Sequence, residues 1–135
     1  PPLRDALMFG VGARETARGL TLVLPAPYFE SDSETLEPEG REFLSRLAGI
    51  MGVEGTLEIL IEGHTQDSGP ASRNITLSEE RAETVRAYLL DLGISEDNIR
   101  AEGFGTTRPI AGNDDPETRV LNERVEILFQ EIQNR

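Results

Sequence analysis

The chain has 135 residues, a length that fits one domain around a single hydrophobic core. Its 13 basic and 25 acidic residues give a formal net charge of −12, which argues against binding to nucleic acid or anionic lipid, since both need a basic surface. The sequence has no cysteine and no lysine, so disulfides, thiolate nucleophiles, cysteine-ligated zinc or iron–sulfur centres and lysine Schiff-base catalysis are excluded.

Targeting signals and membrane helices are not visible in the sequence. No stretch approaches the ~20 apolar residues that a membrane helix needs, and no signal peptide is present. Because the sequence opens with Pro1-Pro2, we expect it to come from a longer precursor that carries any anchor.

The first predicted strand covers residues 20–24, an apolar run that ends at Pro25 and Pro27. Residues 8–13 are predicted to pair with it as a hairpin, with the turn near Arg18-Gly19.

A helix is predicted to follow, with Pro38 in its first turn and Gly52 as its stop. Its apolar residues recur at helical spacing: Phe43, Leu44, Leu47, Ile50 and Met51. We interpret the acidic residues of 30–42 as a solvated face that complements the helix dipole, rather than as a cation site.

The middle of the chain predicts a strand at 57–62 that ends at Gly63, with Leu57, Ile59 and Ile61 on one face. A polar loop from His64 to Thr76 follows. Ser78 is the predicted N-cap of the next helix, and Gly93 its C-terminal stop. The expected buried stripe of that helix is Ala82, Val85, Leu89 and Leu92.

The last third predicts a short strand at 99–102, a short helix from Pro116 to about Asn122, and a strand at 125–129. Gly103 and Gly105 are interpreted as positions of positive φ or close backbone approach. This order predicts an α/β (α+β) domain, βαβαβ(α)β, with one mixed sheet and helices packed on it. We expect one domain over 1–135, with a lead-in or hairpin at 1–19, a core at 20–130 and a tail at 131–135.

Arg81 is the first residue with chemical interest. If the helix begins at Ser78, Arg81 lies near its N-terminus, where a cation opposes the helix dipole. One interpretation is that Arg81 binds a ligand carboxylate there, since such a terminus also suits anions. The other is an i,i+4 or local ion pair with Glu79, Glu80 or another acid.

His64 is the only candidate for an imidazole base, with Ser68 or Ser78 as nucleophile and Asp67 as orienting acid. Closeness in sequence is weak support for such a triad, which is defined by geometry. We prefer the interpretation that His64 hydrogen-bonds the loop that leaves the strand. No catalytic residue, metal site or cofactor is therefore predicted.

Several motifs resemble the OmpA-like C-terminal family, which includes peptidoglycan-associated lipoproteins and the wall-binding domains of flagellar stators. The resemblance covers about residues 20–128. The motifs that carry it are Ile61-Glu62-Gly63-His64-Thr65, Asn74, Leu77-Ser78-Glu79-Glu80-Arg81-Ala82, Gly103-Phe104-Gly105 and Arg124-Val125-Glu126-Ile127.

This resemblance implies a non-catalytic domain that binds the diaminopimelate of the peptidoglycan stem peptide. In such domains an Asp after the Gly-His-Thr motif pairs with the ligand's ammonium, and the Arg that matches Arg81 contacts its carboxylate. The residues implied for ligand binding are His64, Thr65, Gln66, Asp67, Asn74, Leu77, Arg81 and Arg124. The resemblance also implies the periplasm or cell envelope, with a membrane tether outside this chain and other envelope proteins as further partners.

The chain departs from the family pattern at two positions. Gln66 stands in the register of the family's Asp, with Asp67 one place later, and Glu123 stands where the family usually has an Arg. Losing a charge-assisted hydrogen bond weakens binding by about one to two decades. The first hypothesis is therefore a wall-binding module, and the alternative is an interaction or scaffold domain whose wall binding is weakened or lost.

Overall fold

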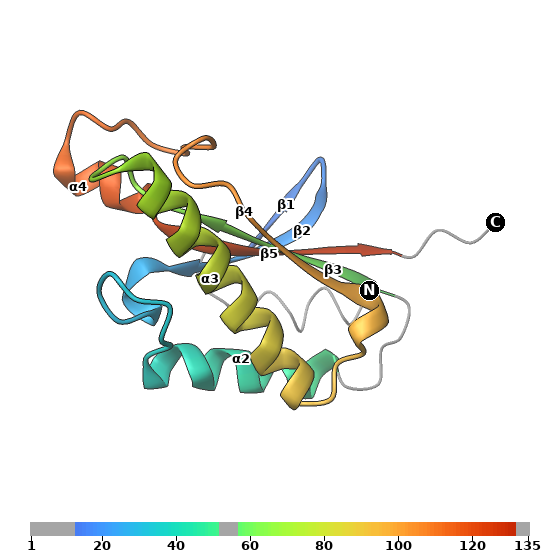
Figure 1. Ribbon diagram of the computed structural model, residues 1–135. Helices are drawn as coiled ribbons and strands as arrows, with labels where there is room; N and C mark the ends of the chain where they lie inside the picture. The colour runs from blue at the N-terminus through green and yellow to red at the C-terminus, as the bar shows by residue number, and fades with distance from the viewer. Residues whose placement is uncertain (1–12, 52–56, 132–135) are drawn as a thin grey trace.

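A computed structural model describes residues 13–51 and 57–131 of the chain. Its five strands form one sheet in the order β1-β2-β5-β3-β4 (Figure 1). The strands are β1 Arg14–Thr16, β2 Gly19–Pro25, β3 Leu57–His64, β4 Ile99–Gly103 and β5 Arg124–Glu131. β5 runs antiparallel to both β2 and β3, while β3 and β4 are parallel. The predicted single mixed sheet is confirmed.

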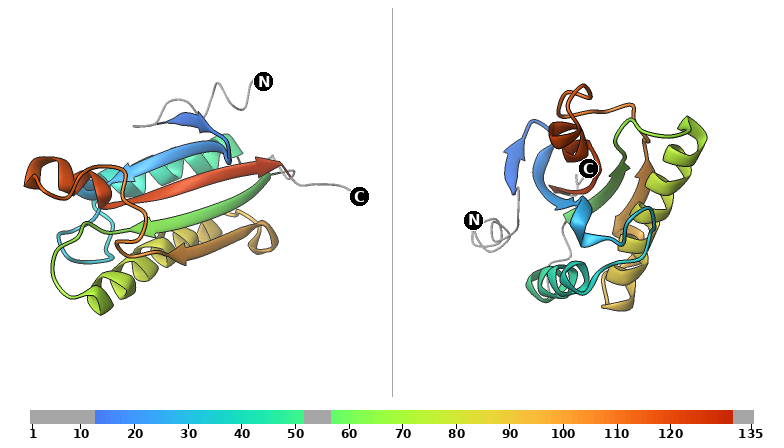
Figure 2. Two further views of the ribbon diagram at one scale, coloured as in Figure 1. Left: turned by 90° about the horizontal axis from the view of Figure 1, so that it is seen from above. Right: turned by 90° about the vertical axis from the view of Figure 1, so that its left-hand side faces the viewer.

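The two long helices, α2 (Pro38–Met51) and α3 (Ala71–Asp91), both pack on one face of this sheet (Figures 1 and 2). Alternate residues of the strands point toward them, as a two-residue repeat requires. The core joins strand residues such as Leu22, Ile61 and Ile127 to residues of both helices. Short helices complete the fold: η1 Ala26–Tyr28, η2 Glu96–Asn98, α4 Pro116–Arg119 and η3 Val120–Asn122.

Most of the predicted elements are confirmed. α2 begins at Pro38, and Phe43, Leu44 and Leu47 are buried as expected. The predicted stop at Gly52 lies outside the described residues. The short helix predicted from Pro116 to Asn122 is α4 followed by η3.

The start of α3 is the main correction. The helix begins at Ala71 after Pro70, so Ser78 is an interior residue and not an N-cap. The Ser78 hydroxyl donates to the Ile75 carbonyl and accepts from the Gly105 amide, and its side chain is fully buried. At the other end, Gly93 has φ +103° and stops the helix as predicted.

Three further predictions differ from the structure. The partner strand of the hairpin is Arg14–Thr16, whereas residues 8–12 lie outside the described residues and Ala13 is in no strand. Strand β3 continues through Gly63 to His64. Leu92 follows the end of α3 and is 44% exposed, so it is not part of the buried stripe that Ala82, Val85 and Leu89 form.

Two glycines let α3 approach the sheet closely. A Cβ at Gly63 would overlap the Ser78 carbonyl, and one at Gly103 would overlap the Glu79 amide nitrogen. Gly105 has φ +57°, a conformation that favours glycine. The close approach and the positive φ that were predicted for the Gly103-Phe104-Gly105 segment are both confirmed.

Candidate functional site

Arg81 lies almost fully buried, 2% exposed, in the middle of α3. Its Nε donates to the Ser33 carbonyl at 2.7 Å, and its Nη2 donates to the Glu30 carbonyl at 3.1 Å. The guanidinium also lies over the Phe29 ring, 4.9 Å from the ring centroid. Two carbonyls and an aromatic face therefore fix the plane of the guanidinium.

The remaining nitrogen of that guanidinium binds a carboxylate. Arg81 Nη1 donates to Glu123 Oε2 at 2.8 Å, across 42 residues of sequence. Because Arg81 lies ten residues after the first residue of α3, the argument that placed it at a helix N-terminus is wrong. Its acidic partner is Glu123 and not a neighbour such as Glu79 or Glu80, both of which are exposed.

Glu123 bridges two of the predicted site residues. It caps the C-terminal end of η3 and is 15% exposed. Its Oε2 accepts from Arg81, and its Oε1 accepts from Gln66 Nε2 at 3.0 Å. The two positions that depart from the family pattern, Gln66 and Glu123, are thus in direct contact.

The other predicted residues of the 64–77 segment are distributed around this contact. Asn74, in the first turn of α3, is buried and donates to the Ser68 carbonyl at 3.0 Å. Leu77 is buried, and Asp67 is exposed. Thr65 is buried, and its backbone amide donates to the Gly105 carbonyl. Gln66, and not Asp67, therefore points to Glu123, whose carboxylate pairs with Arg81.

His64 and Arg124 lie on the other face of the sheet. Because Ile61 faces the helices, the alternation along β3 puts Glu62 and His64 on the opposite face, where His64 pairs in register with Arg124 of β5. The His64 ring stacks on Phe104, with centroids 5.6 Å apart. The structure thus does not bring His64 or Arg124 to the same face as Arg81.

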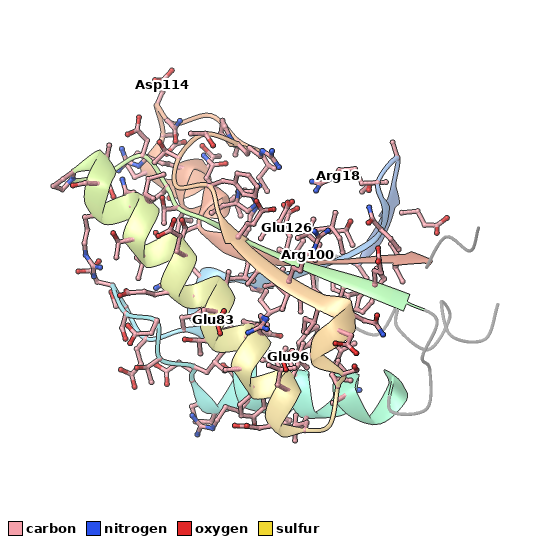
Figure 3. All side chains as sticks on the ribbon, turned by 45° about the vertical axis from the view of Figure 1, so that its right-hand side comes forward. Arg18, Glu83, Glu96, Arg100, Asp114 and Glu126 are labelled. Carbon is pink, nitrogen blue, oxygen red and sulfur yellow. The ribbon has the colours of Figure 1, made fainter. Side chains whose placement is uncertain are left out.

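The carboxylates on that face are paired with arginines. Arg18 donates to both oxygens of Glu62, at 3.1 and 2.5 Å, and Arg108 lies 3.6 Å from it. Arg124 donates to Glu126 at 2.8 Å. Figure 3 shows Arg18 and Glu126 on the side of the sheet away from α2. Sequence reasoning did not assign this network, because its members come from four separate segments.

The pKa of Glu62 reflects this setting. Burial raises the pKa of the carboxyl, whereas His64 and Arg18 lower it, and the balance brings the pKa to about 2. Nε2 of His64 is 3.8 Å from Glu62 Oε1, too far for a hydrogen bond, so the direct Arg18 pair is the firmer of the two lowering causes.

A cation could meet ligand atoms from Glu62, His64 and Glu126, which all lie within 4.8 Å of one another. Both carboxylates, however, already bind arginines, and three guanidinium groups surround the cluster. That positive charge opposes a metal ion, so these residues fit an ion-pair network better than a metal centre.

Catalysis by His64 is not supported. Among the described residues, neither ring nitrogen of His64 has a hydrogen-bond partner, so no hydroxyl is held by it. Ser78 lies in α3, on the opposite face of the sheet from His64, and its hydroxyl is hydrogen-bonded to the backbone of Ile75 and Gly105. The preferred interpretation, that His64 hydrogen-bonds the loop after the strand, is also wrong, because neither buried ring nitrogen has a hydrogen-bond partner among the described residues. The ring instead stacks on Phe104.

Known proteins resemble this chain in sequence and in fold. At the sequence level, the chain is 38% identical over 74% of its length to the peptidoglycan-binding protein ArfA of Mycobacterium tuberculosis, and 35% identical over the same share to the peptidoglycan-associated lipoprotein of Pseudomonas aeruginosa. It spans 31% and 59% of those two proteins, and between 14% and 60% of the other curated relatives considered.

At the level of structure, the periplasmic domain of MotB from Helicobacter pylori matches with a TM-score of 0.80 and 28% identity, over 96% of this chain and 85% of that one. In the described ranges no helix is both long and apolar enough to cross a membrane. The model of the OmpA family matches residues 28–123, more than two thirds of the sequence. The chain therefore belongs to the OmpA family.

Proposed function

We propose that this domain is a non-catalytic peptidoglycan-binding module that holds the stem-peptide diaminopimelate through Arg81. Family membership and relatives that are named for peptidoglycan binding support the ligand class. The observation that carries the site is the buried Arg81 guanidinium, which is fixed by two carbonyls and offers its remaining nitrogen to a carboxylate. A ligand carboxylate needs the same geometry.

The surroundings of Arg81 support a peptide ligand. Gln66 supplies a neutral amide that reaches the Glu123 carboxylate beside Arg81, and Asn74 supplies another polar side chain at the start of α3. Thr65, Asp67 and Leu77 of the 64–77 segment remain in the proposed set of ligand-binding residues. We propose that His64 and Arg124, which lie on the opposite face, contribute indirectly by fixing the end of β3 and the start of β5.

We place the domain in the periplasm or cell envelope. A lipoprotein and a periplasmic domain are among its relatives, which supports this location. A membrane tether would belong to a segment outside this chain. Other envelope proteins are the further partners that we propose.

Co-sedimentation with purified sacculi tests the proposal. The wild type should pellet with diaminopimelate-containing sacculi, and Arg81→Lys should pellet less, since lysine lacks the planar guanidinium fork. Arg100→Ala, at an exposed arginine of β4, is the matched control and should pellet like the wild type. Circular dichroism must show that each variant is folded. Equal pelleting of Arg81→Lys and wild type would contradict the assigned role.

The second candidate is an OmpA-like interaction or scaffold domain whose wall binding is weakened or lost. It is favoured by Gln66, which brings no negative charge, and by Glu123, which already occupies Arg81. Under this candidate the wild type should not pellet with sacculi, and Gln66→Asp should increase pelleting. High wild-type affinity that Gln66→Asp leaves unchanged would rule it out.

A further inference from the structure

We infer that Glu123 is an internal ligand of the Arg81 site, and that an external carboxylate binds there only by displacing it. The site is thus a carboxylate-binding site that the chain itself fills. The identity of the external ligand as a wall peptide rests on the proposed function, whereas the occupancy by Glu123 does not.

The first argument is the way in which the Glu123 carboxylate is held. Each of its oxygens accepts from a different side chain, one from the charged Arg81 and one from the neutral Gln66. The two donors come from α3 and from the loop after β3, and they converge on one carboxylate. Such convergence of a charged and a neutral donor is how a free carboxylate would be bound.

The second argument is the contrast in burial. Arg81 is 2% exposed and fixed by Ser33 and Glu30, so it cannot leave. Glu123 is 15% exposed, so its carboxylate lies at the outer side of the pair. If the pair opens, Glu123 is the side that moves to solvent, because it lies nearer the surface while two backbone carbonyls hold Arg81 in place. The buried arginine that this leaves without a carboxylate is costly, which favours the closed form until another carboxylate takes the place of Glu123.

The third argument is that Glu123 can leave without loss of the fold. Its backbone is held on both sides: its amide donates to the Val120 carbonyl, Asn122 bonds the 110–113 loop, and Arg124 begins β5. A rotation of the Glu123 side chain alone therefore opens the pair. The described structure is then the closed form of the site.

This arrangement sets the affinity for an external carboxylate. Apparent affinity falls in proportion to the fraction of molecules in the open form. For a charge-assisted pair of this kind, the ratio of closed to open molecules is roughly 10 to 100. Glu123→Ala should therefore bind a carboxylate ligand about 10- to 100-fold more tightly than the wild type.

The experiment uses acetate as a probe that is independent of the cell wall. The Arg81 Nε–H signal of Glu123→Ala and Glu123→Gln is followed by NMR as sodium acetate replaces sodium chloride at constant ionic strength. We expect a saturable shift in Glu123→Ala, together with a rise in its melting temperature. The wild type and Glu117→Ala, at an exposed glutamate of α4, should show neither.

If Glu123→Ala does not fold well enough for spectra, Glu123→Gln serves, because it keeps the side-chain volume and removes the charge. An Arg81 signal that acetate leaves unchanged in the folded variants would overturn the inference. A saturable acetate shift of similar strength in the wild type would overturn it as well, because the site would then be open.

A diaminopimelate-containing muropeptide then separates this inference from the proposed function. Binding that is 10- to 100-fold tighter in Glu123→Ala than in wild type supports both. If acetate binds but the muropeptide binds neither protein, the internal ligand stands and the wall-binding proposal fails. If the muropeptide binds both proteins equally, the internal ligand is wrong and the proposed function stands.

Discussion

Replacing Glu62 by glutamine should remove an acid-dependent part of the stability of this domain. Glu62 is 1% exposed and pairs through both oxygens with Arg18. Its pKa of about 2 in the folded state lies below the ordinary value of 4.5. The charged carboxylate is therefore favoured by folding, and protonation favours the unfolded chain.

The magnitude follows from the difference in pKa. Lowering the pKa from 4.5 to about 2, at ~1.4 kcal/mol for each tenfold change in proton affinity, adds about 3 kcal/mol to the free energy of unfolding. This is an upper value, because Arg18 is 45% exposed and salt screens the pair. The contribution is nearly complete above pH ~5.5, where the unfolded carboxyl is almost fully ionised, and it is lost as the pH falls through the unfolded pKa toward ~2.

Urea unfolding of wild type and Glu62→Gln at several pH values between 2.5 and 7 measures this contribution. The stability difference between the two proteins should shrink by up to about 3 kcal/mol from pH 6 to the acid end. Glu58→Gln, at an exposed position of the same strand, is the control. This account of Glu62 would be refuted if the free energies of unfolding of wild type and Glu62→Gln differed by the same amount at every pH.

Two further predictions test the packing of α3. Gly63→Ala should destabilise the domain by several kcal/mol in thermal or urea unfolding, because its Cβ would overlap the Ser78 carbonyl; a stability like that of the wild type would mean that α3 lies farther from β3. Leu89→Ala should cost about 2–5 kcal/mol because Leu89 is fully buried, whereas Leu92→Ala should stay within about 0.5 kcal/mol. Similar losses at both leucines would contradict the observed end of the helix.

Local patterns predicted the secondary structure where one face of an element is apolar. α2 and the strand β5 follow from the spacing of residues such as Leu44, Leu47 and Ile127, because their burial repeats with the period of the element. The start of α3 could not be predicted in this way. Ser78 has the side chain of an N-cap, but its hydroxyl is used by the distant Gly105 amide.

The site was predicted in its residues but not in its geometry. Resemblance indicated Gln66, Arg81 and Glu123 as positions of interest. Their contact joins residues 42 and 57 positions apart, and no local pattern reports such a pair. The extension of β3 to His64 was missed for a related reason: a two-residue repeat decides the face only when the end of the strand is known.

The central claim is that Arg81 binds the carboxylate of a wall stem peptide. Isothermal titration of soluble muropeptides, with diaminopimelate or with lysine at the same position, tests it most directly because lysine lacks that carboxylate. We predict that the wild type prefers the diaminopimelate form at least tenfold, and that Arg81→Lys loses this preference while Arg100→Ala keeps it. Equal affinity of the wild type for both muropeptides, or no binding of either, would contradict the claim.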